Sequence, residues 1–198
     1  MAGAHYDSRS TSTSDTTLRA PGAVDNGSGS AGMIEMARIV AASGVRFSNT
    51  IRFCVWSGEE QGLLGSEAYA RKMENEAADI LAYFNADMTG YKLPSSPRIT
   101  MGMKDSSITE WLLTLSFQIT EMYVPTLPVE LSSSCCSDYI SFYNHGYPAI
   151  GYFQNPGSAS DYPQYHKSTD TYQNNNFEQV RLETQAVLAA VLVFAVPL

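Results

Sequence analysis

Two adjacent glutamates, Glu59 and Glu60, follow an apolar run at residues 50–56. The run predicts a buried β-strand, so the glutamates are expected just beyond its carboxyl end, where open α/β sheets carry their binding sites. Two neighbouring carboxylates are costly unless a positive charge lies between them. The pair therefore predicts a metal ion, which one glutamate binds while the other transfers protons.

Four further residues of metal-binding type are spread along the chain, namely His5, Asp25, Asp87 and His166. Each alone could be an ordinary turn, loop or capping residue, and only the combination with Glu60 indicates a site. Imidazole nitrogen together with carboxylate oxygen suits zinc better than calcium or magnesium. Two zinc ions, about 3.5–4 Å apart and bridged by one carboxylate, would activate a water molecule for hydrolysis.

The composition limits the possible functions. A chain of 198 residues, 44% of them hydrophobic, is long enough for one domain with a sizeable core. Its net charge of −8 argues against a nucleic-acid partner, because phosphate groups need a basic surface. Part of the acidic excess is expected to be metal ligands, whose charge bound cations would offset.

The three cysteines do not indicate a catalytic thiol. Cys54 lies inside the apolar run and is expected to be buried. Cys135 and Cys136 are adjacent, and a disulfide between neighbours is strained, so no pairing is predicted. A thiol-protease site is not favoured, because the histidine nearest to them in sequence, His145, is expected in a turn.

Neither a signal peptide nor a membrane span is predicted. The first ten residues lack a charged start and an apolar run. The longest apolar stretch, residues 186–198, is shorter than the ~18–20 residues that cross a bilayer. It is expected to be a terminal helix packed on the core.

The rest of the chain predicts strands that alternate with helices. Strands are also expected at residues 2–5, 80–86, 98–101, 127–131 and 148–153. Helices are expected after residue 25, where Ser28 or Ser30 can cap the helix and Gly44 can end it, and at 65–73, 108–119, 139–144 and 176–196. This order predicts an α/β fold, in which a mostly parallel sheet is covered by helices on both faces.

One protein family is similar at six segments of the chain, which are GAHYDS, APGAVDNGSG, WSGEEQGLLGS, NADMTGY, CSD and HKSTDT. They resemble the zinc-dependent leucyl aminopeptidases of bacteria and fungi, relatives of glutamate carboxypeptidases and glutaminyl cyclases. The likeness runs across nearly the whole chain. It implies one zinc-peptidase catalytic domain over residues 1–198, a three-layer αβα sandwich with a mostly parallel, mixed central sheet.

The resemblance also implies a role for each candidate ligand. His5 and Asp87 would bind one zinc ion. Glu60 and His166 would bind a second ion, and Asp25 would bridge the two. In such proteins the peptide bond that follows the bridging aspartate is cis.

Further residues would support this chemistry. Glu59 would be the general base and later the general acid. Asp7 would accept a hydrogen bond from the His5 ring and fix its tautomer. Asp138 and Asp170 are expected either to support the ligands or to be surface acids.

Two departures from the family pattern stand out. The family's catalytic domain normally has several dozen more residues before GAHYDS, including the first strands. The chain is therefore expected to be incomplete at its N-terminus, with a sheet edge or face unprotected. These aminopeptidases also carry a tyrosine two residues before the CSD cysteine, where this chain has Ser134. A nearby tyrosine such as Tyr139, or zinc itself, would have to stabilise the oxyanion.

The activity implied is that of a secreted metallo-aminopeptidase, which removes N-terminal residues from peptides or proteins. Four residues that flank ligand-bearing segments could line an apolar pocket for leucine-like N-termini or belong to the ordinary core: Met88, Tyr152, Phe153 and Tyr165. Two alternatives stay open, a single-zinc glutaminyl cyclase that acts as an acyltransferase and a catalytically inactive peptidase-like domain. Metal stoichiometry would separate the three.

Overall fold

The computed structural model describes the chain except residues 13, 15–16, 92–98, 103–106, 133–135 and 155–160. Six strands form one sheet in the order β2-β1-β3-β6-β4-β5. All neighbouring strands are parallel except β4 and β6, which run antiparallel. The strands are β1 (Ala2–His5), β2 (Phe53–Trp56), β3 (Tyr83–Asp87), β4 (Ile99–Gly102), β5 (Val129–Ser132) and β6 (Ala149–Gln154).

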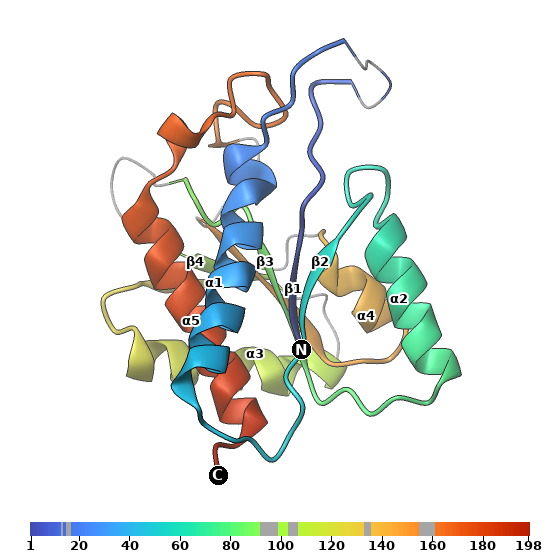
Figure 1. Ribbon diagram of the computed structural model, residues 1–198, viewed down its shortest axis with the longest axis vertical. Coiled ribbons are helices and arrows are strands. Elements are labelled where there is room, and N and C mark those ends of the chain that lie inside the picture. Colours follow the sequence, from blue (N-terminus) through green and yellow to red (C-terminus); the bar gives the residue numbers. More distant parts are fainter. Residues whose placement is uncertain (13, 15–16, 92–98, 103–106, 133–135, 155–160) are drawn as a thin grey trace.

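Helices cover both faces of the sheet (Figure 1). One face carries α1, α3 and α5, and the other carries α2 and α4. The predicted three-layer α/β fold with a mostly parallel, mixed sheet is therefore confirmed. The helices are α1 (Ser28–Ser43), α2 (Leu64–Asn75), α3 (Ser107–Tyr123), α4 (Tyr139–Asn144) and α5 (Phe177–Ala195).

The two cores follow from the alternation of side chains along β3. Phe84 points into the larger core, with Leu112 of α3 and Ala186 of α5. Its neighbour Tyr83 points to the opposite face and stacks on Phe142 of α4, with ring centroids 3.9 Å apart. Every residue of β3 is buried, as expected for a strand covered on both faces. The last residue of this strand is Asp87, so the sheet core holds a candidate ligand in place.

The strand before the glutamates differs from its prediction. β2 begins at Phe53 rather than at residue 50 and lies at the edge of the described sheet, paired with β1. Val55 is 46% exposed, so the expectation of a buried strand was wrong. Its apolar residues suit either a central or an edge strand, because the period of two is the same in both.

The helix that follows Asp25 also begins differently. Its N-cap is Gly27, and neither predicted serine caps it. Instead the Ser28 hydroxyl donates to the Val24 carbonyl at 2.7 Å, and the Ser30 hydroxyl donates to the His5 carbonyl at 2.7 Å. The helix ends at Gly44, whose φ of 68° is the left-handed conformation expected there. Both serines thus tie the start of α1 to ligand-bearing segments.

The other predicted elements are present, with ends that differ by at most four residues. Cys54 is a free thiol that is only half-buried, so the expectation of a buried side chain was wrong. Cys136 is disulfide-bonded, which was not predicted. The expectations for Ser134 and Cys135 lie outside the described residues. Among the described helices, none has both the length and the apolar character that crossing a membrane requires.

Candidate metal centre

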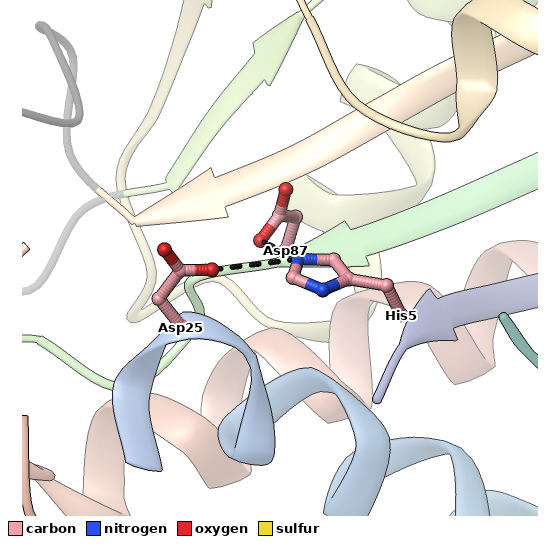
Figure 2. A group of neighbouring side chains, drawn as sticks. All are labelled: His5, Asp25 and Asp87. Atoms are coloured by element: carbon pink, nitrogen blue, oxygen red, sulfur yellow. Dashed lines mark hydrogen bonds and ion pairs between the residues drawn. The ribbon is translucent and has the colours of Figure 1, made fainter. Parts of the chain in front are cut away.

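Two of the predicted ligands come directly from neighbouring strands. His5 ends β1 and Asp87 ends β3, and these strands are parallel, so both side chains emerge at the same edge of the sheet. The His5 Nε2 atom lies 3.2 Å from Asp87 Oδ1 and 3.4 Å from Asp25 Oδ1. Figure 2 shows the imidazole with both carboxylates on the side of this nitrogen. We call these three buried residues the His5 cluster.

The other ligands converge from loops. His166 Nε2 lies 3.1 Å from Asp25 Oδ2 and 3.2 Å from Glu60 Oε2. We call these three residues the His166 cluster, whose ligand atoms lie within 4.8 Å of one another, as do those of the His5 cluster. Asp25 belongs to both clusters and turns one carboxylate oxygen toward each histidine. The structure thus brings all five predicted ligands together.

The shared residue Asp25 is held by a carboxylate from a distant loop. It lies in the turn η1 (Ala23–Gly27). The backbone N–H groups of Val24 and Asp25 donate to the two Asp170 oxygens at 2.9 and 3.1 Å. The Tyr162 hydroxyl donates to the same carboxylate at 2.8 Å. Asp170 is 2% exposed, so it is a buried group that holds the turn of Asp25 and not a surface acid.

The residue after Asp25 fastens the turn to the end of β3. The peptide bond Asp25–Asn26 is cis, as the resemblance implied. The Asn26 side chain donates to the Ala86 carbonyl at 2.9 Å and accepts from the Met88 N–H at 3.1 Å. Asp25 and Asp87 are therefore positioned relative to each other by a direct bridge.

Asp7 has a different role from the one predicted. The His5 Nδ1 atom lies 3.0 Å from the backbone carbonyl oxygen of Asp7, but 3.7 Å from its carboxylate. The carbonyl therefore fixes the ring. The carboxylate accepts the backbone N–H groups of Glu59 and Glu60, at 3.1 and 3.2 Å. Asp7 thus joins the end of β1 to the glutamate loop, and both parts of one residue position the site.

The charges in the centre perturb one another strongly. Burial lowers the pKa of both histidines, but the carboxylates around them outweigh this effect. The pKa of His5 is raised through Asp87 and Asp25, and that of His166 is raised to about 9 through Asp25 and Glu60. Burial raises the pKa of Asp25, yet its contacts with His166 and His5 leave it lowered. The arrangement therefore attracts positive charge at both clusters.

Two other carboxyl groups near the centre hold their protons more tightly than usual. Burial, followed by the negative charge of Asp87, raises the pKa of Glu59 to about 9. Burial also raises the pKa of Asp138, which is fully buried at the start of α4, to about 7. Asp138 is thus no surface acid. Both groups lie in the field of His5 and Asp87.

The comparisons with known proteins agree with this geometry. The family model described as Peptidase family M28 matches residues 1–191. The chain belongs to peptidase family M28. This result bears out the resemblance that the six segments indicated.

Known relatives of this M28 chain are named as aminopeptidases. Leucine aminopeptidase 1 of Arthroderma otae is 32% identical over 189 residues, which cover 91% of this chain and 50% of the relative. The LapA aminopeptidase of Legionella pneumophila superposes with a TM-score of 0.85 at 28% identity, over 100% of this chain and 51% of LapA. BSAP, a zinc aminopeptidase of Bacillus subtilis, superposes with a TM-score of 0.80 at 26% identity, over 98% of this chain and 45% of BSAP. The chain spans about half the length of the relatives it matches.

The four predicted pocket residues of the M28 chain lie in different places. Tyr165 stacks on the His166 ring, with centroids 3.6 Å apart. Met88 is buried in a small cluster with Val24 and Tyr162, next to the turn that carries Asp25. Tyr152, however, is fully buried in the larger core, and Phe153 packs edge-on against Tyr139 in the other core. The first two adjoin ligand-bearing segments, whereas the structure does not bring Tyr152 to either cluster.

Sequence reasoning missed one residue of this centre. Arg9, four positions after His5, donates its Nε–H to Glu60 Oε2 at 2.9 Å. The same Nε atom lies 3.4 Å from His166 Nε2. A basic residue so close to GAHYD, in a chain with a net charge of −8, is the signal that could have pointed to it.

Proposed function

We propose that this M28 chain forms the catalytic part of a zinc aminopeptidase, which removes N-terminal residues from peptides with the help of two zinc ions. One observation carries the proposal. The two oxygens of Asp25 face two different histidines, Oδ1 toward His5 and Oδ2 toward His166. This is the arrangement that a carboxylate bridging two cations needs.

The residues present fit zinc. Each cluster offers one imidazole nitrogen and two carboxylates, whose ligand atoms lie within 4.8 Å of one another. This combination of donors suits zinc. The Glu60 side chain is 4% exposed, and its Oε2 atom faces the other ligand atoms, 3.2 Å from His166 Nε2. A buried carboxylate is costly unless a positive charge lies beside it, and a cation held at Oε2 would supply that charge. His5 and Asp87 would hold one ion, Glu60 and His166 the other, and Asp25 both.

Glu59 is the residue that can move protons. Bound zinc ions supply electrophilic help, since they polarise a carbonyl group and make water more acidic. Cations beside Glu59 would lower its raised pKa, because the surplus of negative charge around it would be offset. The ionised carboxylate would take a proton from the attacking water and return it to the leaving amine. The backbone N–H groups of Glu59 and Glu60 both donate to the Asp7 carboxylate, so the same side chain positions the proposed base and a proposed ligand.

The substrate would be a peptide with a free N-terminus. Two relatives are named as leucine aminopeptidases, which supports a preference for apolar N-terminal residues. Tyr165 and Met88 are the predicted pocket residues that adjoin the ligands and could contact such a side chain. Action outside the cell stays a prediction of the family resemblance.

The test is an assay on chromogenic leucyl and other aminoacyl substrates, with a chelator control. The Glu59→Ala variant should keep the zinc content of the wild type. Its kcat should fall roughly 10²- to 10⁴-fold, which is the rate enhancement that a general base typically contributes. Asp79→Ala, at an exposed acid, is the matched control. Unchanged turnover in Glu59→Ala would remove Glu59 from the mechanism. One zinc ion per chain would favour the cyclase alternative, and none would favour an inactive domain.

A further inference from the structure

Arg9 reaches the His166 cluster from the solvent side. It lies between β1 and η1, and its side chain is 29% exposed, whereas that of Glu60 is 4% exposed. Its Nε–H donates to Glu60 Oε2 at 2.9 Å. A permanent positive charge therefore extends from the surface onto a buried carboxylate of the centre.

The choice of oxygen is informative. Glu60 Oε2, which Arg9 contacts, is also the oxygen that lies 3.2 Å from His166 Nε2 and so faces the other ligand atoms. The other oxygen, Oε1, is buried and has no partner among the described residues. An arginine that supports a metal ligand would bind the carboxylate oxygen that points away from the other ligands. The oxygen that faces them would then be left for the metal. Arg9 does the reverse, so it and a cation would need the same atom.

The His5 cluster differs in this respect. In the described part of the chain, the carboxylates of this cluster pair with histidines: Asp25 with His5 and His166, and Asp87 with His5, and neither pairs with a lysine or an arginine. A cation that binds there displaces no basic side chain. The two clusters therefore differ in whether a positive group must leave first.

We propose that Arg9 is an internal competitor for the cation of the His166 cluster. This inference rests on the proposed two-metal function. The guanidinium cannot lose its proton, so it must break its contact with Glu60 Oε2 and turn into solvent before a metal ion binds there. The ion of the His5 cluster then binds first and more tightly. The ion of the His166 cluster binds second, with its affinity lowered by the contact that Arg9 gives up.

The experiment is a zinc titration of the chelator-treated full chain by calorimetry, repeated with Co²⁺ and visible absorption. Arg9→Gln removes the charge, Arg9→Lys keeps it, and Arg19→Gln is the matched control at an exposed arginine of the same connecting segment. A hydrogen bond to a charged group is worth about tenfold or more in affinity, so Arg9→Gln should tighten the second binding step by roughly that factor. The first step should not change. Arg9→Lys and Arg19→Gln should stay close to the wild type.

A second readout follows Arg9 directly. The Nε–H signal of Arg9 in the NMR spectrum, assigned by its loss in Arg9→Gln, should move at the second equivalent of zinc and not at the first. A second step that is unchanged or weaker in Arg9→Gln would overturn the inference, since Arg9 would then be indifferent to the metal or support it. If the second step is not tightened in Arg9→Gln but two ions bind and peptides are cleaved, only the proposed role of Arg9 is wrong. If fewer than two ions bind, the two-metal function fails as well.

Discussion

The two clusters share Asp25 but are built in different ways. The His5 cluster takes His5 and Asp87 from the ends of adjacent parallel strands, and all three of its residues are buried. The His166 cluster takes Glu60 and His166 from loops, and their side chains are 4% and 10% exposed. A sheet positions the first cluster through its core. In the second cluster, the backbone N–H groups of Glu60 and Asp25 donate to the carboxylates of Asp7 and Asp170. One centre can thus combine a cluster held by strands with a cluster held by loops, and a basic side chain, Arg9, contacts a carboxylate of the second cluster.

The sharpest test of this comparison is a matched pair of histidine substitutions in chelator-treated protein. His5→Ala leaves Asp87 buried without its positive partner and leaves Asp25 with His166 alone, which should lower the free energy of unfolding by roughly 3–5 kcal/mol. His166→Ala should cost less than about half of that, because Arg9 still pairs with Glu60 and His5 with Asp25. Urea unfolding measures both values.

Zinc stoichiometry of the same two variants completes the test. Each should lose one ion and keep the other, since each removes the histidine of one cluster only. Equal losses of stability in the two variants would contradict the distinction between a strand-held and a loop-held half.

The strand-held half was the easier one to predict. His5 and Asp87 follow recognisable apolar strands, and parallel strands place their carboxyl ends side by side. His166 lies in a polar loop with no such pattern, so its residue type and its place in the six family segments were the signals for it. The position of β2 at the sheet edge could not be predicted, because pairing order depends on contacts between distant segments.

Backbone groups explain the errors nearer to the site. The partner of the His5 ring is the Asp7 carbonyl, and every residue has a carbonyl, so its sequence identity carries no such information. The same holds for Ser28 and Ser30, which bond to carbonyls of ligand-bearing segments instead of capping α1. Arg9 was missed because pairing with Glu60 joins residues far apart in the chain.

A smaller effect is expected when the anchor of the glutamate loop is weakened. Asp7→Asn keeps the carbonyl that fixes the His5 ring but loses one of the two oxygens that accept the Glu59 and Glu60 N–H groups. Zinc affinity of the His166 cluster should fall roughly 10- to 100-fold, the usual range for a residue that positions a ligand. Affinity at the His5 cluster should change little. Two-step zinc titration measures both, and a loss confined to the first step would show that the Asp7 carboxylate acts on His5 after all.

The smallest effect concerns a buried carboxyl group that belongs to neither cluster. Glu183 of α5 is fully buried; Gln179 donates to one of its oxygens, and the other has no partner among the described residues. Burial raises the pKa of Glu183 well above its ordinary value of 4.5. The folded protein therefore keeps this proton at pH values where the unfolded chain has lost it. The contribution of Glu183 to the free energy of unfolding is therefore fully present below pH 4.5. It is lost as the pH rises toward the pKa of Glu183 in the folded protein.

Glu183→Gln should remove this loss. Between about pH 5 and pH 8 the wild type should lose more stability than the variant, measured by urea unfolding in the presence of a chelator. The comparison isolates Glu183, because Glu59 and Asp138 titrate in both proteins. Added zinc should flatten the part of the pH dependence that the two clusters cause and leave the difference between wild type and variant in place. If zinc abolished that difference, Glu183 would be coupled to the metal centre, and the separation between the centre and the helix-covered core would be wrong.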